Sequence, residues 1–382
     1  MLLTDRRDAA RAGSSGQLPS WSCAVLVGVG LLGAAFLVPR LAYRAGPGDA
    51  LLLPLAVIGT ALLLRSPDSP VRPTIRAAAP FLWLIMVGSL IGLSDVGLVD
   101  WAIDPLAKEI YVLAIFAGGW HLVWSKRDHL ETILSLQLVA LALMAYYGIK
   151  YGHHKLPTVA PHPNMTGSFS AIMSVAVLMA SRRRVTMILA VALGLAGVFG
   201  SQSFGAAAAL AVGIVGFAVR SFRRTRPDLR PLFVAAVPLT LAVAAMGATV
   251  AFEAVKVDRG DEILDETSEG RFQIWSDALA AWQDRPQGLG PGGLRARGEA
   301  RDEAHNDLLG FAVERSLIGL TGLVGFWVIL WRSGNAGLGT HTVMFAVLVG
   351  GLTHETVHYR HIWVAIAVIL VADGTADGSR RG

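Results

Sequence analysis

Long apolar blocks separated by polar segments dominate the chain. Each block runs for roughly 15 to 20 residues, which is the length that a helix needs to cross the hydrocarbon core of a bilayer. The blocks lie at 21–38, 49–64, 78–93, 105–124, 130–149, 165–180, 185–200, 204–219, 231–251, 308–331, 340–353 and 361–372. Because a spanning segment must satisfy its own backbone hydrogen bonds, we predict an all-α, polytopic transmembrane bundle of about 12 spans, within a range of roughly 10 to 12.

The composition agrees with a membrane protein. Hydrophobic residues make up 53% of the 382 residues and charged residues only 16%, whereas a soluble domain is about a quarter charged. The net charge of +5 does not indicate a nucleic-acid partner, because the basic residues stand at the ends of the apolar blocks. They are concentrated on alternate connections, as in cytoplasmic loops. We therefore predict that both termini lie in the cytoplasm.

The polar segments divide the chain into four parts. A bundle of about nine spans is predicted at 1–251, an outward-facing loop with an amphipathic helix at 252–307, further spans at 308–372, and a cytoplasmic tail at 373–382. The basic N-terminus could begin a signal peptide, but the many later spans favour an uncleaved first helix. The single cysteine, Cys23, excludes an intramolecular disulfide.

Histidine and arginine collect on the predicted outer side. The segment 354–363 holds three histidines, an arginine and a glutamate. His354 and His358 have the spacing of two zinc ligands, but no third ligand is specified, so we predict no metal. A polar, negatively charged substrate explains the cluster better, and the alternative is that interfacial histidines are merely tolerated there.

The long loop contains one clear helical pattern. Phe272, Trp275, Leu279 and Trp282 recur at helical spacing and predict one apolar face. Arg271 stands in the first turn, where a cation and free backbone N–H groups together make an anion site. An exposed arginine with no partner is the equal alternative. The glycine-rich run 288–293 lacks the ending of a nucleotide-binding loop, so we interpret it as a tight turn.

Two charged residues lie inside the span that follows the loop. Glu314 and Arg315 are about two turns deep in the apolar block 308–331. Charged residues inside a span are costly and commonly functional, and here they should face the bundle or a wet cavity. The alternative is a structural ion pair with a neighbouring helix.

These features together resemble the O-antigen ligase and O-antigen polymerase superfamily. The resemblance rests on Glu269-Gly270-Arg271, Trp275, Ala278-Leu279, Gly288-Leu289-Gly290, His305-Asn306-Asp307-Leu308-Leu309, Glu314 and Ile318-Gly319-Leu320. Weaker similarities are Pro163-Asn164 and the run from Tyr359 to Trp363. The order and spacing match the large periplasmic loop of that superfamily and the helix after it.

The resemblance implies a glycosyltransferase that uses neither a metal nor another cofactor. Its donor would be a glycan on an undecaprenyl-diphosphate carrier at the outer face of the bacterial inner membrane, so the loop 252–307 would be periplasmic. Its acceptor would be lipid A-core in a ligase, or another lipid-linked glycan in a polymerase. It implies that His305 activates the acceptor hydroxyl and that Arg271 contacts the diphosphate.

Further site residues follow from their predicted outward position. We expect Arg360 to join Arg271 at the diphosphate, because a leaving diphosphate needs cations. We expect Glu314 to orient His305 or the acceptor. The candidates for glycan binding are Asn306, His361, His162 and Asn164.

Two positions depart from the family pattern. The usual Ser-Arg-Gly at the start of a span reads Ser203-Phe204-Gly205, and a usual glycine is Ser316. Both leave ligase and polymerase open. A transporter or flippase of lipid-linked glycan is the alternative function, since about 12 spans suit one. Against it, the halves show no convincing internal repeat, and the polar cluster lies at the surface rather than at mid-membrane.

Overall fold

The computed structural model describes residues 20–33, 47–94, 99–151, 163–224, 270–296, 304, 306–352 and 359–381. These residues are all-helical. The helices are α2 (Ser20–Leu32), α3 (Pro47–Arg65), α4 (Val71–Ser94), α5 (Val99–Ser125), η1 (Arg127–His129), α6 (Leu130–Tyr151), α7 (Pro163–Ala180), α8 (Arg184–Ser201), α9 (Phe204–Arg224), α12 (Gly270–Asp284), α13 (Gly293–Ala296), α14 (Asp307–Trp331), α15 (Leu338–Gly351) and α16 (Arg360–Arg381).

The apolar blocks predicted these helices well. Each block in the described ranges coincides with one helix, and the block 231–251 lies outside the described residues. Among the described residues, six helical segments are long and apolar enough to cross a membrane: most of α4, α5 and α9, the whole of α8 and α14, and α6 together with η1. The all-α membrane fold is therefore confirmed, while the number of about 12 spans stays a prediction.

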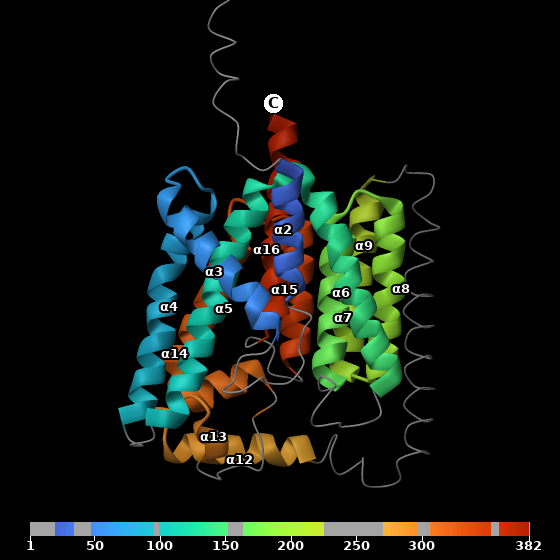
Figure 1. Ribbon diagram of the computed structural model, residues 1–382. Coiled ribbons are helices and arrows are strands. Elements are labelled where there is room, and N and C mark those ends of the chain that lie inside the picture. Colours follow the sequence, from blue (N-terminus) through green and yellow to red (C-terminus); the bar gives the residue numbers. More distant parts are fainter. Residues whose placement is uncertain are drawn as a thin grey trace, which may run out of the picture.

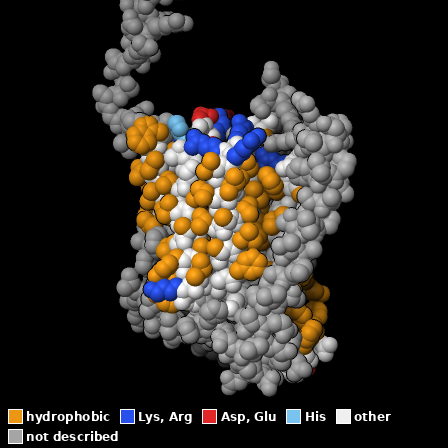
Figure 2. Space-filling view, turned by 90° about the vertical axis from the view of Figure 1, so that its right-hand side faces the viewer, with side chains coloured by type: hydrophobic (Ala, Val, Ile, Leu, Met, Phe, Trp, Pro, Cys, Tyr) orange, Lys and Arg blue, Asp and Glu red, His pale blue; other side chains and the backbone are white. Residues whose placement is uncertain are grey.

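The long helices stand side by side, and α12 lies across one end of the bundle (Figure 1). We call this the loop end, defined by α12 and α13. The opposite end carries the α3–α4 turn, η1 and the α7–α8 turn. Lysine and arginine side chains gather there, above a hydrophobic flank, on the face drawn in Figure 2. We call it the basic end, defined by Arg127, Arg182, Arg183 and Arg184.

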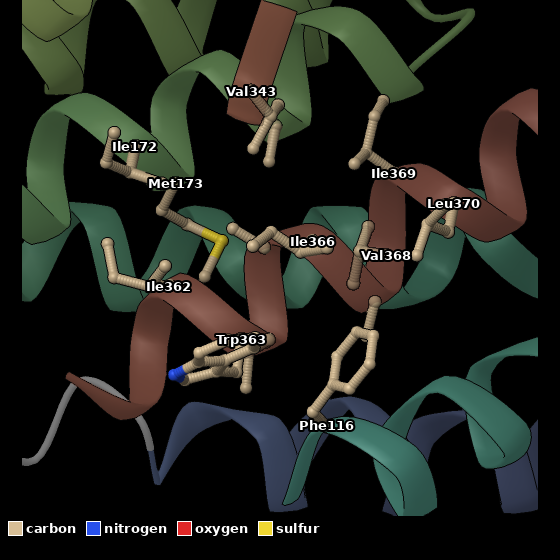
Figure 3. Close-up of a cluster of buried hydrophobic side chains, with 14 of the residues drawn as sticks. Phe116, Ile172, Met173, Val343, Ile362, Trp363, Ile366, Val368, Ile369 and Leu370 are labelled. Atoms are coloured by element: carbon tan, nitrogen blue, oxygen red, sulfur yellow. The ribbon is translucent and has the colours of Figure 1, made fainter. Parts of the chain in front are cut away.

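Helix α16 occupies the middle of the bundle. Every side chain from His361 to Ala372 is buried, as expected for a helix that is apolar all round. Trp363 contacts Phe116 of α5, with ring centroids 5.5 Å apart, and stacks on Trp327 of α14 at 5.9 Å. Figure 3 shows α16 side chains meeting Met173 of α7 and Val343 of α15. The bundle is thus built around α16, which continues to Arg381 through the segment that we expected to be the tail.

The outer surface of the bundle is apolar where lipid would contact it. Large side chains such as Leu64, Trp83, Val185 and Ile188 are each more than 60% exposed. A soluble protein rarely exposes so much apolar surface. Exposed apolar flanks therefore agree with a multi-pass membrane protein.

Candidate functional site

A small second core fixes the loop helices on the start of α14. Its buried members are Ala278, Ala281, Leu289, Leu294, Ala304 and Val313. The Trp275 indole Nε1 donates a hydrogen bond of 2.8 Å to the carbonyl oxygen of Ala304. Trp275 stands one turn after Arg271, and Ala304 immediately precedes His305 in the sequence. This contact therefore joins the two segments that carry the principal predicted site residues.

The contact face of α12 differs from the predicted one. Ala278 and Ala281 are the buried residues, Trp275 and Trp282 are half-buried, and Phe272 and Leu279 are 67% and 44% exposed. The predicted helix is present, but its buried side is lined by the alanines, and two of the four predicted apolar residues are exposed. Small alanines allow close helix approach, so they face α14. The exposed pair is the kind of surface that an interfacial helix presents to lipid.

The glycine-rich run forms the tight turn that we predicted. Gly288, Gly290 and Gly292 have φ angles of 97°, 82° and 72°, which glycine adopts without steric cost. The turn binds the backbone of α14: Leu289 N–H donates to the Val313 carbonyl and Gly290 N–H to the Glu314 carbonyl, both at 2.9 Å. The turn therefore attaches the loop to α14 through two backbone hydrogen bonds.

A kink in α14 places those carbonyls. Ser316 has φ 60° and ψ −178°, a conformation that is almost restricted to glycine. Two α4 glycines make room for it. A Cβ on Gly88 would lie 2.3 Å from the Arg315 carbonyl oxygen, and one on Gly92 would lie 2.4 Å from Gly290 N. The departure from the family glycine at position 316 thus falls on the one residue inside α14 whose backbone favours glycine.

Three charged side chains meet beside the kink. The guanidinium of Arg315 is 1% exposed, and it binds Glu109 of α5 through Nη2 and the Glu314 carboxylate through Nη1 at 3.2 Å. It also lies over the Phe311 ring, 4.3 Å from the centroid. Burying an unpaired charge is very costly. The positive charge of Arg315 lowers that cost for the carboxylates of both Glu109 and Glu314. We call Glu109, Glu314 and Arg315 the charge cluster.

The charge cluster contains the structural ion pair that was one of the two interpretations of Glu314 and Arg315. The ion pair with a neighbouring helix is present, and Glu109 is the partner that sequence reasoning missed. A usable signal existed, because Glu109 is a carboxylate inside the apolar block 105–124.

A second polar group lies where α7 packs on α16. His361 is fully buried, and its Nε2 lies 3.3 Å from the Ser168 hydroxyl oxygen of α7. Its ring contacts Phe169 and Tyr359, with centroid distances of 5.1 and 5.4 Å. Arg360, the first residue of α16, is half-buried. Ser168 was missed by the sequence reasoning, because a serine in an apolar block gives no distinctive signal.

The α8–α9 turn contacts the start of α7. Asn164, predicted for glycan binding, is half-buried there. A Cβ on Gly167 would lie 2.5 Å from the Ser201 hydroxyl oxygen. Phe204, which replaces the family arginine, begins α9 and is 73% exposed. The position therefore stands at a span start, as the resemblance implies, but carries no charge.

Asn306 has a structural task. Its side-chain oxygen accepts a hydrogen bond from Leu309 N at 3.1 Å, which makes it the N-cap of α14. Its Nδ2 donates to the Leu352 carbonyl oxygen at 3.3 Å and so ties α14 to the end of α15.

Three predicted site residues cannot be placed in full. His305 and His162 lie outside the described residues. The backbone of Arg271 is in the first turn of α12, while its side chain lies outside the described set. Within the described ranges, no three His, Cys, Asp or Glu side chains are close enough to hold a metal ion together.

One comparison with known proteins gives a family. Residues 169–330 match the family model described as O-antigen ligase. The match confirms the resemblance to the O-antigen ligase and polymerase superfamily. It covers fewer than half of the residues of the chain. No curated protein matches the chain.

The O-antigen ligase match covers the part of the structure that holds most of the contacts described above. It runs from α7 to the end of α14 and includes the glycine turn, the kink and two members of the charge cluster. Glu109, Arg360 and His361 lie outside it. Together with the apolar helices, the match supports a multi-pass membrane enzyme of the O-antigen ligase type.

Proposed function

We propose that the chain is a glycosyltransferase that takes a glycan from an undecaprenyl-diphosphate carrier. It passes the glycan to an acceptor sugar at the periplasmic face of the inner membrane, as an O-antigen ligase or as an O-antigen or exopolysaccharide polymerase. The acceptor is lipid A-core in the first case and a second lipid-linked glycan in the other. The observation that carries the proposal is the O-antigen ligase match over residues 169–330.

The chemistry assigns a role to each predicted residue. The acceptor hydroxyl oxygen forms a bond to the anomeric carbon while the bond from that carbon to the diphosphate breaks. His305 takes the hydroxyl proton, because an imidazole is a base near neutral pH. Arg271 and Arg360 stabilise the negative charge that develops on the diphosphate. No metal is required in this scheme.

The contact between Trp275 and Ala304 supports this pairing of residues. It fixes the α12 turn that carries Arg271 against the residue before His305. A fixed arrangement of base and cation lowers the barrier more than a mobile one, because less orientational entropy is lost in the transition state.

Glu314 enters the scheme as a positioning residue. Its carboxylate is 11% exposed and bound to Arg315, so it is held in one orientation. Its backbone carbonyl holds Gly290 of the turn. Glu314 therefore supports the start of α14, the helix that directly follows His305 and Asn306 in the sequence. Asn306, His162 and Asn164 remain the proposed glycan contacts. His361, which was proposed with them, is fully buried beside Ser168, so we assign it a positioning role instead of a direct contact.

The test is the surface glycan of a strain that lacks this protein, run on a gel beside complemented strains. Loss of long chains, with a single repeat still on lipid A-core, indicates a polymerase. Loss of every glycan-bearing lipid A-core band, with polymer accumulating on the carrier, indicates a ligase. An unchanged glycan pattern in the deletion strain would refute the proposal.

A further inference from the structure

A large cavity opens at the basic end of the bundle, opposite the candidate site. Its volume is about 970 Å³, in the range of small-molecule sites. The α3–α4 turn, the end of α5, η1, the start of α6, the α7–α8 turn, α9, the α14–α15 turn and α16 all contribute to its lining. The proposed glycan transfer makes no use of this cavity.

Three arginines line the cavity, and contacts on three separate elements fix them. The Arg127 guanidinium lies 4.9 Å from the centroid of the Trp124 ring and donates to the Trp124 carbonyl at 3.3 Å. Arg220 donates from Nη1 to the Met179 carbonyl. The backbone N–H of Arg182 donates to Glu131 Oε1 at 2.5 Å. The hydrogen bond of Arg182 uses its backbone N–H, and that of Arg127 uses one of the five N–H donors of a guanidinium, so both guanidinium groups can reach a ligand.

An equal number of carboxylates lines the same cavity. They are Asp68, Asp128 and Glu131. Glu131 is committed to the α7–α8 turn, where its second oxygen accepts from the Ser181 hydroxyl at 2.8 Å. Asp68 and Asp128 are exposed. A purely anionic ligand would meet these carboxylates, whereas a ligand with both a phosphate and an ammonium group matches both signs.

The deep wall of the cavity is apolar. Trp120 is 1% exposed, and Leu370 and Val371 of α16 are fully or almost fully buried beside it. A charged rim over an apolar wall at the end of a helix bundle is the setting in which lipid headgroups bind. An ammonium with N–H donors suits carboxylate acceptors better than a quaternary ammonium, which has none.

We propose that this cavity binds a phosphoethanolamine group, and that its source is a phosphatidylethanolamine of the surrounding membrane. Arg127 and Arg182 bind the phosphate oxygens, and Arg220 adds positive charge to the lining. Asp68 and Asp128 bind the ammonium. This site is independent of the proposed glycan transfer and lies at the other end of the molecule.

The experiment uses the full chain, purified in detergent and analysed by native mass spectrometry. The probes are phosphatidylethanolamine, phosphatidylglycerol, phosphatidylcholine and soluble phosphoethanolamine. Arg182→Gln removes a rim guanidinium but keeps the backbone bond to Glu131. Arg183→Gln is the matched control, because Arg183 is an exposed neighbour that does not line the cavity.

We expect phosphatidylethanolamine to bind more tightly than the other two lipids. Arg182→Gln should weaken its binding about tenfold, the loss typical of one charge-assisted hydrogen bond, and Arg183→Gln should not. Asp128→Asn should reduce the preference for phosphatidylethanolamine over phosphatidylcholine.

Several results would overturn the proposal. Equal effects of the two arginine substitutions would mean that the cavity rim is not the binding site. If phosphatidylglycerol binds as tightly as phosphatidylethanolamine, the carboxylates of the cavity do not recognise an ammonium group, and the proposed ligand is wrong. Binding of soluble phosphoethanolamine without any lipid binding would refute the membrane as the source. Unchanged melting temperatures of the variants show that each comparison concerns folded protein.

Discussion

At the Ser316 kink, a glycine variant should be more stable than an alanine variant, which reverses the order found in a regular helix. In a regular helix, glycine is about 0.8–1.0 kcal/mol less stable than alanine. At Ser316, with φ 60° and ψ −178°, any side chain costs about 1–3 kcal/mol of backbone strain. We therefore expect Ser316→Gly to be more stable than Ser316→Ala.

The magnitude follows from the terms that differ between the two variants. Both lose the hydrogen bond from Ile318 N to the Ser316 hydroxyl, so that loss cancels. Glycine avoids the strain but loses about 0.5–1 kcal/mol more conformational entropy on folding. The net advantage of glycine over alanine is about 0–2.5 kcal/mol, with a central value near 1 kcal/mol.

The assay is equilibrium unfolding in mixed micelles, followed by tryptophan fluorescence. Ser135 is the control, since it is half-buried in the interior of α6 and its hydroxyl also makes one hydrogen bond, to the Glu131 carbonyl. There Ser135→Ala should be more stable than Ser135→Gly by up to about 1 kcal/mol. If Ser316→Ala equals or exceeds Ser316→Gly in stability, the strained kink is not a property of the folded protein.

Three further predictions follow from neighbouring contacts. Gly88→Ala should destabilise the protein by about 1–3 kcal/mol or more through overpacking, because the new Cβ would meet the Arg315 carbonyl oxygen. Gly119→Ala is the control and should not destabilise it, because a Cβ there would find no atom closer than 3.9 Å. Unfolding in micelles compares the two variants, and equal losses of stability would contradict the close approach of α4 to α14. Arg315→Met should lower the free energy of unfolding by about 3–5 kcal/mol, because it leaves two buried carboxylates uncompensated. Adding Glu109→Gln and Glu314→Gln should recover most of that loss. A triple variant no more stable than the single one would refute the charge cluster. Trp275→Phe removes the hydrogen bond to Ala304 and should lower glycan transfer. Trp282→Phe is the control and should not lower it, since the Trp282 indole N–H has no hydrogen-bond partner among the described residues. The gel of surface glycan compares the two variants, and equal activities would disprove the role of the contact between Trp275 and Ala304.

The helices could be predicted from sequence because each needs a long apolar block to span a bilayer. The glycine turn could also be predicted, since Gly288 and Gly290 are residues that tolerate positive φ. The central place of α16 could not, because an apolar block has the same composition whether it faces lipid or protein.

The site was only partly predictable for a similar reason. The kink lies at a serine, while Pro and Gly are the residues that usually mark kinks, and only the comparison with the family glycine drew attention to position 316. The pairing of Glu109 with Arg315 joins residues more than 200 positions apart, and neither residue alone specifies its partner. Asn306 was expected to bind glycan, yet its position before an apolar run is also an N-cap signal.

The most direct test of the central proposal is the surface glycan of a deletion strain complemented with His305→Ala. His129→Ala serves as the control, because His129 lies in η1 at the basic end, and both variants must reach the membrane at wild-type levels. We predict that His305→Ala leaves the glycan of the deletion strain and that His129→Ala restores the wild-type pattern. Full restoration by His305→Ala would contradict the assignment of His305 as the base.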